Sequence, residues 1–225
     1  MRRVLCYGDS NTWGSATVPR PDGRYGERER WPGVLQDALG ADWNVIEEGL
    51  SARTTVHTDP VEGVWLNGSR YLFPCLRSHR PLDAVALMLG TNDLKHRFNV
   101  SAREIALSAA SLVQIIRKSE CGPELSAPRV LLICPPPLLE DFGTRPDFTE
   151  LFRGGREKSL QLPARYQEFA QLHGAEFLDA GQVIRSSAFD GLHFDPDAHD
   201  ALGRAVAERL RAMFDAGAAK ASPAG

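Results

Sequence analysis

Two short segments far apart in the chain carry residues that together could perform nucleophilic catalysis. Ser10 lies in the motif G-D-S-N at residues 8–11, directly after an apolar run, and Asp190 precedes His193 by three residues. A serine hydroxyl is a weak nucleophile unless a base takes its proton, and a histidine oriented by a carboxylate can act as that base. An aspartate on the same glycine-containing turn can reach Nδ1 and direct Nε2 toward the hydroxyl. This pair of segments predicts acyl transfer through Ser10.

Acyl transfer also needs hydrogen-bond donors that stabilise the developing oxyanion. Asn92 lies in G-T-N-D at residues 90–93, after a second apolar run, and Gly49 follows a third run with an unhindered N–H. Taken alone, the Ser10 motif is more typical of a turn in which Ser10 caps a helix, and the Asn92 motif also fits an ordinary turn. The chemistry therefore depends on whether the fold brings these turns together.

The pattern of apolar residues predicts how the turns are positioned. Short apolar runs alternate with stretches of helical periodicity, which is typical of an α/β fold with a parallel sheet covered by helices. Ser101 and Glu104 predict a capping box for one helix, and Asp195 is the predicted N-cap of the last helix. Parallel strands end at one edge of a sheet, where open α/β folds bind their ligands. The predicted strands are residues 3–7, 43–47, 83–89, 129–134 and 175–178.

Composition restricts the class of protein. The 225 residues are 43% hydrophobic and 24% charged, which predicts one folded domain over residues 1–214 and a disordered tail over 215–225. A net charge of -3 provides no basic field for nucleic acid. No apolar run approaches the roughly 20 residues that cross a bilayer, so no membrane partner is expected. We recognise no export signal, and the predicted location is the cytoplasm.

The remaining polar and cysteine residues give no sign of a metal site. The four cysteines are scattered without a C-x-x-C pair, which argues against a zinc site and a disulfide framework. His193 and His199 do not share a helix face, because Pro196 begins the last helix between them. Segments 18–30 and 135–158 are predicted as long loops, and aromatic residues of the second are expected to cover apolar surface. The other histidines are interpreted as surface or hydrogen-bonded polar groups: His57, His79, His96, His173 and His199.

Four motifs, in this order, resemble those of the SGNH hydrolases, the GDSL esterase and lipase superfamily. They are G-D-S-N at 8–11, E-E-G-L-S-A-R at 47–53, G-T-N-D at 90–93 and D-G-L-H at 190–193. Further segments, I-E-E-G-L-S-A-R-T-T, M-L-G-T-N-D, C-P-P-P-L and F-L-D-A-G, resemble the subgroup of bacterial arylesterases and acyltransferases related to the mycobacterial acyltransferase. The resemblance spans nearly the whole chain and implies a flavodoxin-like three-layer α/β/α sandwich.

The resemblance also implies a role for each motif. Ser10 would be the nucleophile, His193 the base and then the acid, and Asp190 the group that orients His193. The N–H groups of Ser10 and Gly49 and the side chain of Asn92 would form the oxyanion hole, with the Ala52 N–H as a substitute donor. The chemistry requires no metal and no organic cofactor. By position, the residues expected to line the substrate pocket are Asn11, Trp13, Ala52, Lys95, Phe152 and Leu192. Position 11 carries Asn where the family motif has Leu.

These observations predict a serine esterase that hydrolyses short-chain acyl or aryl esters through an acyl-serine intermediate, with acyl transfer as an additional activity. One alternative is a carbohydrate acetyl esterase, which would resemble other members of the same family. An alternative of another class is a non-catalytic, oligomeric binding module. The resemblance further implies a homo-oligomer, and the mycobacterial relative is an octamer. The expected partner is a small-molecule ester.

Overall fold

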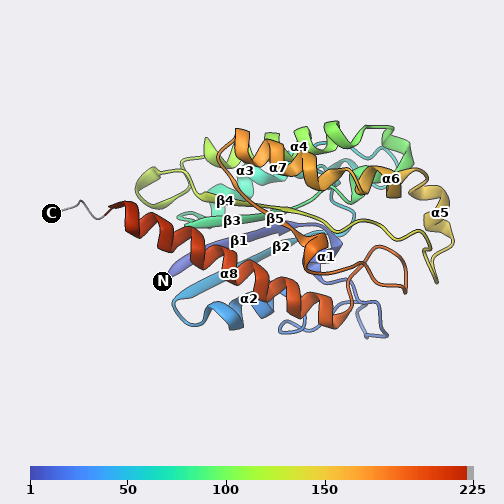
Figure 1. Ribbon diagram of the computed structural model, residues 1–225, viewed down its shortest axis with the longest axis horizontal. Coiled ribbons are helices and arrows are strands. Elements are labelled where there is room, and N and C mark those ends of the chain that lie inside the picture. Colours follow the sequence, from blue (N-terminus) through green and yellow to red (C-terminus); the bar gives the residue numbers. More distant parts are fainter. Residues whose placement is uncertain (222–225) are drawn as a thin grey trace.

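The computed structural model describes residues 1–221 and is built on one sheet of five parallel strands (Figure 1). The strand order is β2-β1-β3-β4-β5, with every neighbouring pair parallel. Each predicted strand overlaps an observed one, so the α/β class is confirmed. The strands are β1 (Arg2–Gly8), β2 (Trp43–Gly49), β3 (Ala84–Met88), β4 (Arg129–Cys134) and β5 (Glu176–Asp179).

Helices cover both faces of the sheet and complete the three-layer sandwich, as Figure 1 shows. On one face lie α3 (Gly68–His79), α4 (Ala102–Arg117) and α7 (Leu162–Leu172), and on the other lie α2 (Trp31–Leu39) and α8 (Pro196–Ala221). The apolar core is accordingly divided in two. Leu72 and Ile105 belong to the cluster under the first group of helices, and Trp31 and Leu202 belong to the cluster under the second. None of the helices in residues 1–221 has the length and apolar composition that a membrane crossing requires.

The sequence predicted the N-terminal residues of two helices, and both stand where they were predicted. The capping box of α4 is present, with Ser101 accepting from the Glu104 N–H and Glu104 accepting from the Ser101 N–H. Asp195 stands at the predicted N-cap position of α8, since its carbonyl accepts the His199 N–H at 3.0 Å, and its carboxylate accepts hydrogen bonds from the hydroxyls of Thr17 and Ser187. The helix continues to Ala221, so the tail predicted from residue 215 begins as helix, and residues 222–225 lie outside the described part of the chain.

The predicted loop 135–158 is only partly irregular. It contains the short helices α5 (Asp147–Leu151) and α6 (Gly155–Ser159), whereas segment 18–30 has no helix or extended strand. Phe142, Phe148 and Phe152 pack against one another, with ring centroids 5.5 to 6.1 Å apart. They join the core cluster that also holds Leu192, so the loop aromatics do cover apolar surface, as predicted.

The register of the sheet brings the sequence motifs to one edge. Gly8 at the end of β1 pairs with Gly49 at the end of β2 and with Met88 at the end of β3. The turn that carries Ser10 therefore lies between the turns that follow Gly49 and Met88. The carboxyl edge of the sheet is thus where a site should be sought.

Candidate active site

A serine, a histidine and an aspartate form one hydrogen-bonded chain at this edge. The Ser10 Oγ lies 3.0 Å from His193 Nε2, and His193 Nδ1 lies 2.6 Å from Asp190 Oδ2. Ser10 and Asp190 are buried, and 15% of the His193 side chain is exposed. The imidazole is therefore placed to take a proton from the serine hydroxyl while the carboxylate fixes its tautomer.

The turn after β1 holds Ser10 at the first position of the short helix α1 (Ser10–Trp13). A side chain at Gly8 would place its Cβ 2.0 Å from Thr12 Oγ1 and 2.8 Å from the Met88 carbonyl, so only glycine fits there. Asp9 caps α1 by accepting the Asn11 N–H at 3.0 Å. Burial raises the pKa of the Asp9 carboxyl to about 6, against the opposing effects of the Asn11 N–H and His193.

The turn that carries the histidine is held mainly by Asp190. Asp190 Oδ1 accepts from the N–H groups of Leu192 at 3.0 Å and His193 at 2.9 Å, which leaves Oδ2 for the imidazole. Gly191 adopts φ +71°, a conformation that favours glycine. Burial alone would raise the pKa of the Asp190 carboxyl, but the hydrogen bonds from His193 and Leu192 lower it below its usual value. Asp190 is therefore held as the anion that orients His193.

Among the candidate oxyanion donors, the structure differs from the prediction at Gly49. The Ser10 N–H is at the first position of α1, and Ala52, at φ +64°, lies in the pocket wall beside Ser10 and Asn92. Within the described residues, neither backbone N–H has a backbone acceptor. Gly49 does not line this pocket. Its Cα packs against α1, where an added Cβ would lie 2.2 Å from the Trp13 nitrogen, so its lack of a side chain serves close packing.

Two residues whose roles the sequence analysis did not predict support these donors. Buried Arg53 donates to the carbonyls of Gly8, at 2.8 Å, and Glu48, and its own carbonyl accepts from Asn92 Nδ2 at 3.1 Å. Asp93 accepts from the Thr55 N–H at 3.0 Å and the Thr55 hydroxyl at 2.6 Å. Arg53 and Asp93 thus fix the segment around Ala52 relative to the strand ends. Arg53 ends the motif at residues 47–53 and Asp93 ends the motif at residues 90–93, but only the fold shows which residues they contact.

Ser10 and His193 open into a pocket of about 420 Å³ with two unlike sides. The first side is apolar and consists of Phe148, Leu151, Phe152 and Leu192. The other side contains Lys95, which is only 2% exposed and donates to both carboxylate oxygens of Glu62 at 2.8 Å. An ion pair of Arg145 with Asp147 lies at the rim. The volume suits a small ester, with polar and apolar contacts available on different sides.

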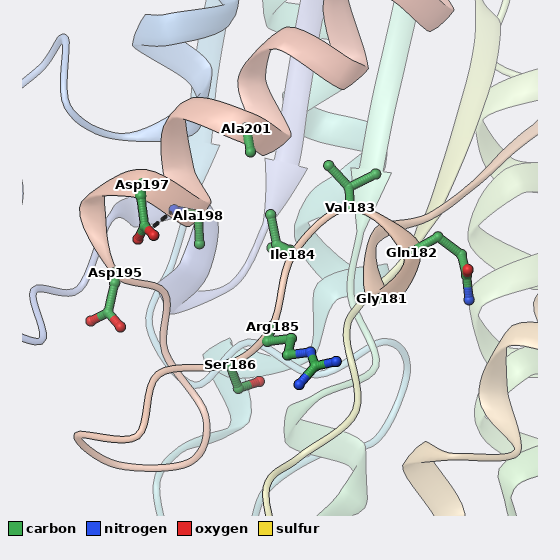
Figure 2. Close-up of a pocket in the computed structure, with 10 residues that line it drawn as sticks. All are labelled: Gly181, Gln182, Val183, Ile184, Arg185, Ser186, Asp195, Asp197, Ala198 and Ala201. Carbon is green, nitrogen blue, oxygen red and sulfur yellow. Dashed lines mark hydrogen bonds between the residues drawn. The ribbon is translucent and has the colours of Figure 1, made fainter.

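A larger hollow, of about 570 Å³, lies between residues 181–186 and the first turns of α8 (Figure 2). Among the residues labelled in Figure 2, Asp197 bonds the Ala198 N–H and Arg185 lies beside Ser186. The Ser186 hydroxyl donates to the Pro137 carbonyl at 3.1 Å, and no histidine of the described residues lines the hollow. Without a base beside a nucleophile, this hollow offers no counterpart to the Ser10 site.

Comparison with known proteins agrees with this geometry. Residues 6–201 match the model of the GDSL-like lipase/acylhydrolase family. The chain belongs to this family. An M. smegmatis aryl esterase is 44% identical, with a TM-score of 0.87 over 94% of this chain and 99% of that one. A carbohydrate acetylesterase from Sinorhizobium meliloti is 41% identical, with a TM-score of 0.87 over 95% and 100%. A further carbohydrate acetylesterase family member from Sinorhizobium meliloti is 38% identical, with a TM-score of 0.88 over 96% and 100%. A search of curated proteins gave no match.

The chain is thus a carboxylic ester hydrolase with the SGNH hydrolase fold, and its predicted pocket residues can be placed. Ala52, Lys95, Phe152 and Leu192 line the pocket of this GDSL-like hydrolase. Asn11 and Trp13 do not. Asn11 is 2% exposed and donates to the Leu192 carbonyl at 3.3 Å, so it supports the turn that carries His193.

Trp13 is turned toward a different part of the hydrolase. The Arg24 guanidinium lies 4.9 Å from its ring centroid and also donates to its carbonyl at 2.7 Å. Trp13 therefore helps to fix segment 18–30 against α1. Position along the chain placed both residues near the serine, but a four-residue helix directs their side chains away from the pocket.

Proposed function

We propose that Ser10 is the nucleophile of a serine esterase that cleaves short-chain acyl and aryl esters. The single observation that carries the proposal is the hydrogen-bonded chain from Ser10 through His193 to Asp190, open to a pocket of about 420 Å³. A pocket of this size accommodates a short acyl group and a compact alcohol group. Similarity to a protein named an aryl esterase supports the same class of substrate.

The reaction follows from the geometry in two half-reactions. His193 Nε2 takes the Ser10 proton as Oγ bonds to the ester carbonyl carbon, and the carbonyl oxygen becomes an oxyanion. The N–H groups of Ser10 and Ala52 and the Asn92 side chain stabilise that oxyanion. Collapse breaks the bond to the alcohol oxygen, which receives the proton from His193. Water then repeats the sequence on the acyl-serine and releases the acid.

A carbohydrate acetyl ester is the second candidate substrate, and the Lys95–Glu62 side of the pocket favours it. Charged donors and acceptors at this wall can bind sugar hydroxyls, and two of the similar structures carry the name carbohydrate acetylesterase. The two candidates differ in their leaving group. Comparing kcat/KM for phenyl acetate with that for an acetylated monosaccharide separates them.

Further properties belong to the same proposal. An alcohol that enters in place of water would give acyl transfer, and measuring ester products in the presence of added alcohol tests it. The four cysteines are buried and free, which is typical of a reducing cytoplasm. We expect one catalytic domain over residues 1–214.

A homo-oligomer, expected as an octamer, is supported by large exposed apolar side chains. Val61 is 74% exposed, Trp65 68% and Phe73 48%, all within one stretch of sequence. Where exposed apolar side chains form a contiguous patch, the surface is typical of a subunit interface. Light scattering at micromolar concentration tests this expectation, and a monomer would contradict it.

The decisive experiment measures hydrolysis of p-nitrophenyl esters, from acetate to long acyl chains, by the wild type and by Ser10→Ala. We expect the fastest cleavage with acetate or butyrate and none by Ser10→Ala. An active-site organophosphonate should label the wild type at Ser10. A wild type that neither hydrolyses esters nor reacts with the phosphonate would instead indicate a non-catalytic binding module.

A further inference from the structure

A second group of chemically active side chains lies outside the pocket, between the end of β2 and the end of α3. It consists of Glu48, Cys75 and His79, each of which offers one ligand atom, and these atoms lie within 4.8 Å of one another. His79 Nε2 lies 2.8 Å from Glu48 Oε1. Cys75 is fully buried, whereas 29% of the His79 side chain and 19% of the Glu48 side chain are exposed. The ester chemistry uses none of the three.

The fold explains why these side chains converge. Cys75 and His79 stand four residues apart on α3, so they occupy adjacent turns of one helix face. Glu48 comes from β2, the edge strand of the sheet, and its carboxylate meets that face. The sequence gives no sign of this group, because its three residues come from a strand and a helix and include only one cysteine.

The three donors form a ligand set typical of a borderline-soft divalent cation. Zn²⁺ binds cysteine thiolate, histidine nitrogen and carboxylate oxygen in tetrahedral sites. With Zn–S bonds of about 2.3 Å and Zn–N or Zn–O bonds of about 2.0 Å, tetrahedral ligand atoms are roughly 3.3 to 3.6 Å apart. The observed separations are 2.8 Å between His79 Nε2 and Glu48 Oε1 and within 4.8 Å for the other pairs, so binding one ion requires the side chains to adjust. A thiolate and a carboxylate also supply two negative charges, which balance a divalent ion.

We propose that Glu48, Cys75 and His79 form a Zn²⁺-binding site that joins α3 to the end of β2. As the Zn–S bond forms, the Cys75 thiol loses its proton to solvent, and a water molecule completes the fourth position. The exposed parts of Glu48 and His79 give the ion access from solvent. Glu48 also lines a surface cleft of about 470 Å³, together with Trp65 and Tyr71. Glu48 directly precedes Gly49, so the bound ion would stabilise the strand end on which α1 packs.

The test is a titration of the metal-free full chain with Co²⁺ as a spectroscopic probe. We expect a thiolate-to-Co²⁺ charge-transfer band that saturates at one ion per chain and disappears when Zn²⁺ is added. Cys75→Ala should lack the band. The matched control is Cys121→Ala, which removes another fully buried free thiol and should retain it. His79→Gln leaves the thiol in place and should weaken Co²⁺ binding by at least about tenfold.

A second measurement tests the expected stabilisation. Zn²⁺ should raise the Tm of the wild type and of Cys121→Ala but not that of Cys75→Ala or His79→Gln, because an ion that binds only the folded chain stabilises it. Ser10→Ala should bind Co²⁺ normally, so failure of the esterase proposal does not affect this one. The proposal is overturned if the wild type shows no charge-transfer band, or if Cys75→Ala, folded by circular dichroism, still shows it. In either case the group is only a hydrogen-bonded contact between α3 and β2.

Discussion

Replacing Asp190 by Asn separates the two tasks of this carboxylate. Oδ1 holds the backbone N–H groups of Leu192 and His193, and Oδ2 receives the His193 Nδ1 proton. In Asp190→Asn the amide oxygen can keep the two backbone contacts, but the amide NH₂ now faces Nδ1. The imidazole must then accept at Nδ1 and carry its proton on Nε2, where it cannot take the proton of Ser10.

The expected magnitudes differ sharply for activity and stability. A wrong histidine tautomer lowers kcat by about 10³- to 10⁴-fold in such sites, equivalent to a barrier increase of about 4 to 5.5 kcal/mol. The free energy of unfolding of Asp190→Asn should change little, because the backbone N–H groups keep an acceptor. Asp190→Ala removes that acceptor from two backbone groups around a 3%-exposed site, at a cost of about 1–3 kcal/mol for each group.

The assay combines steady-state hydrolysis of p-nitrophenyl acetate with denaturant unfolding of both variants. Asp200→Asn is the control, because within the described part of the chain its exposed carboxylate pairs only with Arg204, on the surface of α8. It should match the wild type in kcat. If Asp190→Asn keeps activity within about tenfold of the wild type, Asp190 does not set the tautomer of His193. If Asp190→Ala is as stable as Asp190→Asn, Asp190 does not hold the turn.

Four further predictions test other parts of the site. Asn92→Ala should lower kcat about 10²- to 10³-fold with KM little changed in steady-state kinetics, since it removes an oxyanion donor; a change confined to KM would refute that role. Gly49→Ala should lower the free energy of unfolding by about 1–3 kcal/mol, because its Cβ would lie 2.2 Å from the Trp13 nitrogen; an unchanged Tm would contradict the packing role. The raised pKa of Asp9 makes its ionisation in the folded state costly, so its contribution to stability is greatest below pH 3.8 and falls up to pH of about 6. These two units correspond to about 3 kcal/mol, and denaturation at several pH values should show Asp9→Asn gaining stability over the wild type across this window; parallel pH profiles would refute the assignment. Esterase activity should survive chelation by EDTA, because the serine chemistry uses no metal, and a loss restored only by added metal would contradict it.

The residues of the candidate site could be located from the sequence because each stands in a short local motif at a strand end. Asp190 and His193 are close in sequence, so their contact depends on one turn and little on the rest of the fold. Ser10 and Asn92 needed only the rule that parallel strands end at one edge. The strands themselves were recognisable because β1, β3 and β4 are buried on both faces and are almost continuously apolar.

Features that depend on distant contacts could not be predicted in this way. The sequence analysis did not predict α3, whose interior contains Pro74, a residue that propensity excludes from helices. Burial of Leu72 and Leu76 in the core stabilises it nonetheless. The resemblance named the Ala52 N–H only as a substitute donor, because no sequence pattern indicates that a non-glycine residue adopts φ +64° there. The packing of Gly49 against α1 likewise depends on contacts between distant segments.

The difference between local motifs and distant contacts also explains why the motifs identify the reaction but not the substrate. Two similar proteins, 44% and 41% identical to this chain, are named for different substrates, so overall similarity does not choose between aryl and carbohydrate esters. The choice must come from the pocket walls. Because Lys95 and Glu62 neutralise each other at 2.8 Å, this wall offers hydrogen bonds without a net charge, which suits a neutral polyhydroxy group better than an anion. Phe148 and Phe152 on the other wall offer the apolar surface that an aryl group needs. We therefore expect the contacts of the leaving group with these two walls to decide which ester is cleaved fastest.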